Sequence, residues 1–318
     1  MMVKIKALGR ENKLVLGLAV AVLCLVLVLT SPWYIPWFVW TKARTNYVSS
    51  PHTPYYAVDK YDANYTVPKV IHQTWKDSNV PQKWQAARQS CIDLHPDYEY
   101  KLWTDARADA FIQDRYPALA HTYRNYPYVI QSADAIRYAL LHHYGGIYID
   151  LDIVCLHPLD FLRMYGFVMP KTWPVGFSND FLVGAPGHPF LQKMVKSLPS
   201  HNWGLISKYA TVMFSTGPMF VTALATSYKH KKELAVLPDD MYGKYIVSPD
   251  PLFLHLHGSS WHGEDAKSVL WFLHHPVVIS VAVLVSVAAL AVYVLFLKLR
   301  PPQRYSVLEA ENPLNKMC

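Results

Sequence analysis

Residues 131–155 constrain the fold of this chain most, because their hydrophobic period changes from helical to extended at the paired glycines Gly145 and Gly146. Apolar residues before the glycines recur at three- and four-residue spacing, which is the period of a helix. Residues 147–149 then form an apolar run that predicts a short strand buried on both faces, as in a parallel or mixed sheet covered by helices. The segment therefore predicts a helix followed by a central strand in an α/β fold.

Two aspartates, Asp150 and Asp152, follow the predicted strand directly. Open α/β sheets bind their ligands at the carboxyl ends of the strands, and two carboxylates one residue apart project roughly the same way. They would present several hard oxygen ligands to Mn²⁺ or Mg²⁺, cations that are commonly completed by the phosphates of a substrate. An Asp-X-Asp sequence also arises by chance in a solvated turn, but the apolar residues 147–149 and 153–156 on either side favour the cation site.

The rest of the chain continues this alternation of strands and helices. Before the aspartates, the sequence predicts strands over residues 69–75 and 98–103 and helices over 82–94 and 105–126, the second broken at Pro117. After them, it predicts a strand over residues 166–169, another strand that starts near Asn179 and Asp180, and helices over 189–198 and 219–231. This order predicts one domain, residues 68–268, with a mainly parallel mixed sheet.

Two long apolar segments flank this domain, residues 14–40 and 269–297. Both are long enough to span a bilayer, and the aromatic residues within 33–40 are typical of a membrane interface. Positive charges precede the first segment and follow the second, so residues 1–13 and 298–318 are predicted to be cytosolic and the domain luminal. A cleavable signal peptide is the alternative for the first segment, although no clear small-residue cleavage site precedes the aromatic residues.

Residues 41–67, between the first apolar segment and the domain, predict an extended stem. Asn64 in this stem begins an Asn-X-Thr acceptor triplet for N-glycosylation, which agrees with the luminal side. Cys91 and Cys155 fall within the domain, where one disulfide is permitted but not implied. The basic residues behind the net charge of +7 are scattered, so we do not expect binding to nucleic acid.

A second polar cluster lies in residues 254–264, with three histidines, two serines and a tryptophan in an apolar frame. Histidines close to a membrane surface are often merely interfacial, so the residues alone leave the role of His257 open. The role of Trp75, at the end of the first predicted strand, is open in the same way. Its indole can belong to the core or can stack on a planar base at the ligand edge of the sheet.

Four motifs resemble those of the DXD-containing sugar transferases. They are residues 68–75 (PKVIHQTW), 132–138 (SADAIRY), 144–152 (YGGIYIDLD) and 257–261 (HGSSW). That family includes the fungal initiating α-1,6-mannosyltransferases and the inositol phosphorylceramide mannosyltransferases, and its catalytic core is related to the large clostridial glucosylating toxins. The resemblance spans about residues 68–265, and it implies a GT-A-like fold and retaining transfer of a sugar from a nucleotide diphosphate.

The resemblance also implies which residues form the site. Donor binding is assigned to Gln73, Trp75, Asp134, Arg137, Tyr148, Asp150 and Trp261. A divalent cation is assigned to Asp152 directly, to Asp150 through a water, and to the late residues His257 and Ser259. Acceptor contacts are expected at Asn179, Asp180 and His262, and the catalytic set is Asp150, Asp152, Arg137 and Asp180.

Elementary chemistry supports these roles. Departure of a diphosphate builds negative charge, which a divalent cation and the guanidinium of Arg137 can disperse without proton transfer. Retention requires either a covalent carboxylate intermediate or front-face attack assisted by the departing phosphate. Asp180 is a possible pocket acid, but nothing in the sequence marks an assured nucleophile, so front-face attack is favoured.

Within the resembling family, the second apolar segment favours an enzyme that acts on a membrane lipid. Inositol phosphorylceramide mannosyltransferases also carry hydrophobic segments after the domain, and they share motifs such as those at residues 178–181 and 260–263. The resemblance therefore implies transfer of mannose from GDP-mannose to inositol phosphorylceramide, at the bilayer of the Golgi, with a separate membrane-embedded regulatory subunit. The alternatives are an α-mannosyltransferase that acts on N-glycans or other protein-linked glycans, and a luminal non-catalytic scaffold protein that holds a structural cation.

Overall fold

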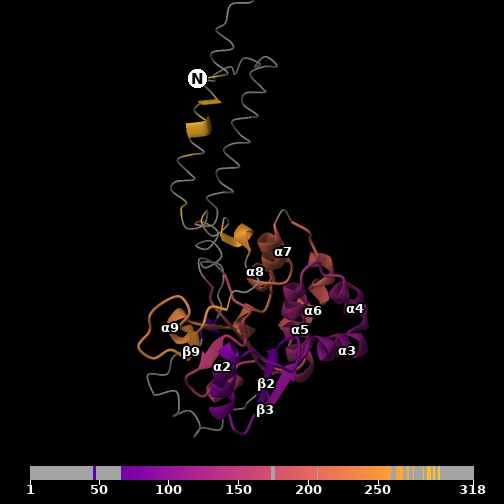
Figure 1. Cartoon of the computed structure of the whole chain (residues 1–318), viewed down its shortest axis with the longest axis vertical. Helices are drawn as coiled ribbons and strands as arrows, with labels where there is room; N and C mark the ends of the chain where they lie inside the picture. The colour runs from indigo at the N-terminus through magenta and orange to yellow at the C-terminus, as the bar shows by residue number, and fades with distance from the viewer. Residues whose placement is uncertain are drawn as a thin grey trace, which may run out of the picture. The chain divides into compact units, whose positions relative to one another are not determined.

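The computed structural model describes residues 46–47, 66–172, 176–205, 207–258 and 263–267, with scattered positions between 271 and 293. The chain divides into two compact units, Pro32–His274 and Met1–Ser31 with His275–Cys318, and every element named below belongs to the first (Figure 1). The predicted membrane segments and Asn64 lie outside the described residues, apart from a few positions of the second segment. Within the described part of the chain, no helix is both long enough and apolar enough to cross a membrane.

A seven-stranded mixed sheet forms the centre of this unit. Its strands, in order across the sheet, are β1 (Asn46–Tyr47), β8 (Ala235–Leu237), β6 (Phe167–Pro170), β7 (Phe181–Gly184), β4 (Gly146–Ile149), β2 (Val70–Thr74) and β3 (Glu99–Trp103). Among these seven strands, neighbours run parallel except at β7, which is antiparallel to both β4 and β6. The predicted α/β fold with a mainly parallel mixed sheet is confirmed.

Strand β4 is the buried central strand that the glycine pair predicts. Ile147 and Ile149 belong to the core on one face of the sheet, and Tyr148 belongs to the core on the other. Gly145 and Gly146 have φ angles of 64° and 106°, in the left-handed region that favours glycine. A Cβ atom on Gly146 would lie 2.6 Å from the carbonyl oxygen of Val70 on β2, so a side chain here would push the two strands apart.

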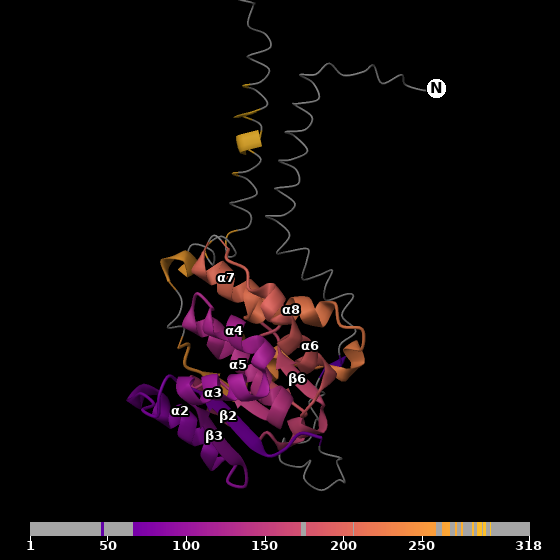
Figure 2. The same cartoon turned by 90° about the vertical axis from the view of Figure 1, so that its right-hand side faces the viewer.

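Helices cover both faces of the sheet (Figure 2). One face packs against α3 (Asp105–Arg115), α4 (Pro117–Arg124), α5 (Val129–Tyr144), α6 (Pro189–Ser197) and α8 (Pro218–Thr226), with α7 (Lys208–Ser215) packed on α8. The other face packs against α2 (Gln82–Asp93), the 3₁₀ helix Asp160–Met164, α9 (Asp239–Tyr242), and an antiparallel pair of strands, β5 (Ile153–Cys155) and β9 (Phe253–His255). Two further 3₁₀ turns are Pro199–His201 and Lys231–Glu233.

Most boundaries agree with the predicted pattern. The break at Pro117 is confirmed, since α3 ends at Arg115 and α4 begins at the proline. Helix α8 ends at Thr226 instead of continuing to residue 231, because residues 229–232 (KHKK) offer no apolar face. Helix α7 and strands β5, β8 and β9 were not predicted, and neither was β1, which lies in the predicted stem. Strands of two or three residues are too short to display a two-residue period.

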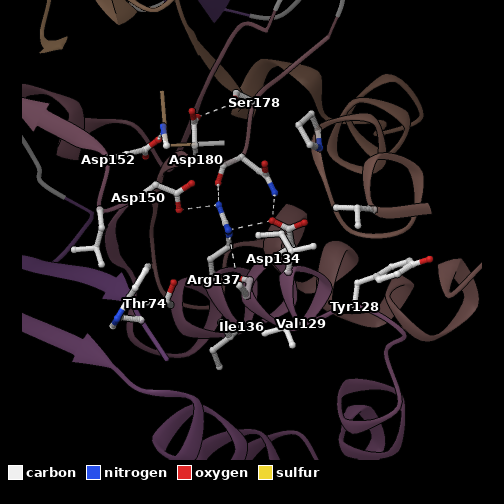
Figure 3. A pocket seen from close by; sticks show the side chains of 18 of the residues that line it. Thr74, Tyr128, Val129, Asp134, Ile136, Arg137, Asp150, Asp152, Ser178 and Asp180 are labelled. Atoms are coloured by element: carbon white, nitrogen blue, oxygen red, sulfur yellow. Dashed lines mark hydrogen bonds and ion pairs between the residues drawn. The ribbon is translucent and has the colours of Figure 1, made fainter. Parts of the chain in front are cut away.

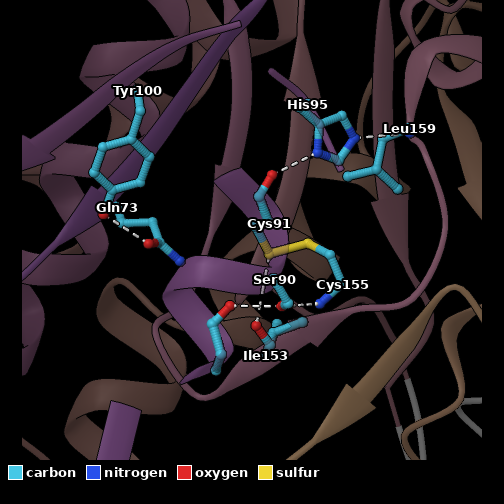
Figure 4. Close-up of a disulfide and its surroundings, with 9 residues drawn as sticks. Gln73, Ser90, Cys91, His95, Tyr100, Ile153, Cys155 and Leu159 are labelled. Atoms are coloured by element: carbon cyan, nitrogen blue, oxygen red, sulfur yellow. Dashed lines mark hydrogen bonds between the residues drawn. A yellow bond between two sulfur atoms is a disulfide. The ribbon is translucent and has the colours of Figure 1, made fainter. Parts of the chain in front are cut away.

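A disulfide joins Cys91 of α2 to Cys155 of β5 (Figure 4), so the pairing that the sequence left open is made. His95 lies beside it. Its Nε2 accepts a hydrogen bond from the backbone N–H of Leu159 at 2.9 Å, so its Nδ1 carries the proton and donates to the carbonyl oxygen of Cys91 at 2.7 Å. Strand β5 begins at the residue after Asp152, and these bonds therefore anchor the segment that follows the aspartates.

Candidate active site

A cavity of about 960 Å³ lies at the edge of the sheet where β2 and β4 end and β7 begins. Because β7 runs against β4, its first residue, Phe181, pairs with Ile149, the last residue of β4. The backbone N–H of Asp150 donates to the carbonyl oxygen of Asp180 at 2.8 Å. The antiparallel strand therefore brings Asp180 to the same edge as Asp150 and Asp152.

The guanidinium of Arg137 connects three elements in the wall of this cavity (Figure 3). It forms ion pairs with Asp134 at 3.0 Å and with Asp150 at 3.2 Å, and it donates to the carbonyl oxygen of Asn179 at 2.7 Å. It also lies 4.5 Å from the centroid of the Tyr148 ring, within the range of a cation–π contact. With only 3% of its side chain exposed, Arg137 holds Asp150 in a fixed position relative to α5.

Asp134 is a buried carboxylate one helical turn before Arg137. It accepts hydrogen bonds from the side-chain amide of Asn179 at 2.8 Å and from the hydroxyl of Thr216 at 2.9 Å. Burial raises the pKa of Asp134, while Arg137 and these two hydrogen bonds oppose that rise. The amide of Asn179 also donates to the Tyr138 hydroxyl at 2.8 Å, so both of its hydrogens are used. Asn179 therefore holds Asp134 in place, and the predicted acceptor contact would fall to other atoms of this residue.

The position of Asp150 is fixed by a hydrogen bond from Tyr148. The Tyr148 hydroxyl donates to Oδ1 of Asp150 at 2.7 Å and lies 2.9 Å from the hydroxyl of Thr74 on β2. Burial, followed by the negative charges of Asp152 and Asp180, raises the pKa of Asp150 to about 7 against the opposing effect of Arg137. Tyr148 is fully buried, so it positions Asp150 from beneath and does not itself line the cavity.

Asp152 connects the aspartate loop to the late cluster predicted from the sequence. Its Oδ2 accepts from the backbone N–H of Gly258 at 2.8 Å, and its carbonyl oxygen accepts from the N–H of Leu256 at 2.9 Å. His257, between these two residues, lines the cavity and adopts a φ of 52°, which is uncommon for a residue with a side chain. A Cβ atom on Gly258 would lie 2.7 Å from the Trp84 ring, so glycine is needed where the loop passes α2.

These residues fit a divalent cation that is completed by its substrate. Asp150 and Asp152 supply carboxylate oxygens, which are the ligands that Mn²⁺ and Mg²⁺ prefer. Across the described ranges, no three His, Cys, Asp or Glu side chains converge to hold an ion by themselves. Repulsion from Asp152 and Asp180 contributes to the raised pKa of Asp150. A cation bound between Asp150 and Asp152 would offset that repulsion.

Asp180 is a further carboxylate of the cavity, and its oxygens accept from three donors. Ser178 and Tyr242 donate to Oδ1, the first at 2.6 Å, and the ammonium of Lys244 donates to Oδ2 at 2.6 Å. Burial alone would raise its pKa, but Lys244, His255 and the hydrogen bonds outweigh burial and hold the pKa of Asp180 well below the usual range. The sequence identified Asp180 but not Tyr242 or Lys244, since nothing local links residues more than 60 positions away.

Three indole rings, those of Trp75, Trp84 and Trp103, line the part of the cavity next to β2 and β3. The Nε1 atom of Trp75 is buried and has no hydrogen-bond partner among the residues that the structure describes. These flat apolar faces suit stacking with a planar base. Trp75 thus lines the cavity at the end of β2, and its contact with the donor stays a prediction.

Gln73 lies elsewhere. It is fully buried on the other face of β2, where its Oε1 accepts from the hydroxyl of Tyr100 at 2.8 Å, close to the disulfide (Figure 4). Alternate residues of a strand point to opposite faces, so Thr74 lines the cavity and Gln73 does not. The predicted positions Ser259, Trp261 and His262 lie outside the described residues.

The fold and the cavity together define an α/β protein with an acidic, arginine-containing and indole-lined ligand site at its strand ends. Residues 81–168 match the family described as the glycosyltransferase sugar-binding region containing the DXD motif. The matched segment runs from the start of α2 into β6, and it includes the Asp134–Arg137 pair and both aspartates of the motif. Over these residues the chain is similar to the glycosyltransferase sugar-binding region that contains the DXD motif.

The chain is similar to inositol phosphoceramide mannosyltransferase 3 of Schizosaccharomyces pombe, with 43% identity over 215 residues that make up 66% of this chain and 60% of the relative. It is also similar to the mannosyl phosphorylinositol ceramide synthase SUR1 of Saccharomyces cerevisiae, with 44% identity over 206 residues, 63% of this chain and 53% of the relative. The chain thus spans between 53% and 60% of the length of these two relatives. Among solved structures, the UDP-bound glycosyltransferase domain of the YGT toxin aligns with 54% of this chain and 80% of its own, at 9% identity and a TM-score of 0.44.

Proposed function

We propose that this chain is a retaining, metal-dependent mannosyltransferase that moves mannose from GDP-mannose to inositol phosphorylceramide. The observation that carries the proposal is the cluster of Arg137, Asp134, Asp150 and Asp152 in one cavity of the sugar-binding region. The similarity to the two yeast proteins, an inositol phosphoceramide mannosyltransferase and a mannosyl phosphorylinositol ceramide synthase, supports mannose as the sugar and an inositol phosphoceramide as the acceptor.

The donor would lie along the strand ends. Trp75 would stack on the base, and Asp134 and Asp150, held by Arg137, would accept hydrogen bonds from hydroxyl groups of the sugar or ribose. A divalent cation held by Asp150 and Asp152 would supply charge stabilisation to the departing diphosphate. Arg137 adds a fixed positive charge that needs no reorganisation during the reaction.

The state of Asp180 supports front-face attack. A carboxylate that accepts from Ser178, Tyr242 and Lys244 is already neutralised, so it is a poor nucleophile for a covalent intermediate. In the front-face mechanism, the bond from the anomeric carbon to the diphosphate breaks as the acceptor hydroxyl bonds to the same face. The proton of that hydroxyl passes to the departing phosphate oxygen.

The cellular setting belongs to the same proposal. Two membrane spans, residues 14–40 and 269–297, would hold the active site at the luminal face of the Golgi bilayer, with both termini in the cytosol. The flanking positive charges support this orientation. Mn²⁺ as the cation, glycosylation at Asn64 and a separate membrane regulatory subunit complete the proposal.

One assay tests the activity. The purified full chain is given labelled GDP-mannose with or without Mn²⁺, and with either inositol phosphorylceramide or a soluble oligomannose as acceptor. We expect cation-dependent label in the lipid, and loss of that label in Asp152→Ala with little change in thermal midpoint. Asp114→Ala, at an exposed aspartate of α3 outside the cavity, is the matched control. Label found only in the oligomannose would refute the lipid acceptor, and full activity of Asp152→Ala would refute the role of the aspartate pair.

A further inference from the structure

Four described cations line the cavity, and they are not equivalent: Lys76, Arg137, Lys208 and Lys244. Arg137 is fully engaged with its buried partners, and Lys76 adjoins Trp75 at the part of the cavity that suits a base. Lys208 begins α7, and Lys244 follows the end of α9. Two lysines on separate elements therefore line the cavity without a part in the donor site described above.

Lys208 and Lys244 belong to segments that approach each other. Each is followed by a tyrosine that lines the cavity, and Tyr245 is close enough to Tyr209 to raise its pKa, after the larger effect of burial. The ammonium of Lys208 lies 5.8 Å from the centroid of the ring of Tyr128, the residue that precedes α5. Both lysines therefore line the cavity from segments that approach each other.

Lys244 is also close to the reacting groups. Its ammonium donates to Asp180, and it interacts electrostatically with Asp152. In an acceptor whose attacking hydroxyl and phosphodiester share one ring, the phosphate must lie within one ring of the reacting atoms. A cation beside Asp180 is in the right place for that phosphate.

The residues after Lys244 become apolar and exposed. Tyr245 lines the cavity, Ile246 is 47% exposed and Val247 is fully exposed. They lie on the loop between α9 and β9 (Figure 1). Val129, at the start of α5, lines the cavity and is 75% exposed. Within four residues the loop thus changes from a cation at the reacting groups to apolar side chains in solvent, which is the polarity order of a phospholipid from headgroup to tail.

We propose that Lys244 and Lys208 bind the phosphodiester of a lipid acceptor, and that Ile246 and Val247 contact its hydrocarbon chains. This inference rests on the proposed transfer to a phosphate-containing lipid, and it names the part of the site that recognises that lipid. The rival source of an anion here is the diphosphate of the donor. If the lysines bind the lipid phosphodiester, their removal raises KM for the lipid. If they bind the donor diphosphate, their removal raises KM for the donor.

Binding without catalysis gives the first test. Glycerophosphoinositol, a soluble phosphodiester of inositol, is titrated into the full chain in detergent, beside myo-inositol and inorganic phosphate. We expect glycerophosphoinositol to bind more tightly than either, and Lys208→Met and Lys244→Met each to weaken it about tenfold, the value of one charge-assisted contact. Lys171→Met removes a lysine that pairs with Asp239 at 3.4 Å outside the cavity, and it serves as the matched control.

Lys208→Met is the decisive variant, since no described ion pair would be broken by it, whereas Lys244→Met leaves Asp180 without its cation. Thermal midpoints of both variants separate binding from folding. Unchanged affinity of folded Lys208→Met for glycerophosphoinositol, or equal affinity of the wild type for inorganic phosphate, would overturn the proposal.

Kinetics give the second test. We expect both lysine variants to raise KM for inositol phosphorylceramide about tenfold, and Lys244→Arg to keep the wild-type lipid KM. Lys208→Met should leave KM for GDP-mannose and the rate of donor hydrolysis unchanged. A rise in the donor KM instead would assign the lysines to the diphosphate and refute the inference. If the wild type neither hydrolyses the donor nor transfers the sugar, the proposed function fails, while the titration still decides whether the phosphodiester site exists.

The loop residues are tested separately. Ile246→Ser with Val247→Ser should raise KM for the long-chain lipid in mixed micelles several-fold, and should leave the affinity for glycerophosphoinositol unchanged. An unchanged lipid KM would refute the contact with hydrocarbon.

Discussion

Removing the disulfide between Cys91 and Cys155 should lower the free energy of unfolding by about 4 kcal/mol. The two cysteines are 64 residues apart in sequence, and the loop-closure entropy of a cross-link of that span is worth about 4 kcal/mol. Both side chains are buried, so a Cys91→Ala, Cys155→Ala variant also loses some packing. For a domain of this size, such a loss lowers the thermal midpoint by roughly 10 °C.

The assay is thermal and denaturant unfolding of the full chain, followed by near-UV circular dichroism of its indoles. Cys24→Ser with Cys318→Ser is the matched control, because it removes the other two cysteines of the sequence. Dithiothreitol should shift the wild type and this control towards the double alanine variant and leave the variant itself unchanged. A loss below about 1 kcal/mol would refute the reasoning, since it would mean that the disulfide does not constrain the unfolded chain.

Three further predictions concern single residues. Arg137→Met should lower the free energy of unfolding by about 3–5 kcal/mol, because Asp134 would stay buried without its cation. Urea unfolding of this variant and of Arg137→Lys checks the prediction, and an equal loss in both variants would contradict it. Burial lowers the pKa of His72 from 6.5 to about 4, so the folded state favours the neutral imidazole. The free energy of unfolding should therefore be highest above pH 6.5, fall by about 3 kcal/mol as the pH drops to 4, and then level off. His72→Gln should remove most of this pH dependence in thermal melting, and an unaltered dependence would exclude His72 as its source. Gly258→Ala should reduce the rate of sugar transfer more than tenfold, because the added methyl group would displace the loop from the Trp84 ring. The thermal midpoint should change little. Wild-type kinetics of the folded variant would show that the close contact between residue 258 and Trp84 is not needed.

The sequence predicts the central part of the fold well, because its elements are long and periodic. Helix α5 and strand β4 are marked by a change of period at Gly145 and Gly146, and the break between α3 and α4 is marked by Pro117. The direction of β7 was not predictable in this way. A period of two residues identifies a strand but does not give its orientation, and that orientation is what places Asp180 beside Asp150.

In the candidate site, the residues of one continuous motif were predicted and their long-range partners were not. Asp134, Arg137, Asp150 and Asp152 come from one continuous motif, and the structure places them together in the cavity. Their long-range partners had no local signal: Thr216 on Asp134, and Tyr242 and Lys244 on Asp180. Gln73 shows that membership of a motif does not by itself place a residue in the site. It is next to Thr74 in sequence, yet its side chain lies on the other face of the same strand.

The hydrogen bond from Gly258 to Asp152 has a consequence for the order of substrate binding. Strand β9 is three residues long, and it joins the loop that carries Lys244 on one side to the loop that carries His257 and Gly258 on the other. In the proposed mechanism, a donor that engages Asp152 would restrain Gly258, and through β9 it would also restrain the loop that carries Lys244. The two substrates would then add in sequence, with the donor first, and steady-state kinetics would show inhibition by GDP that competes with the donor and is mixed towards the lipid.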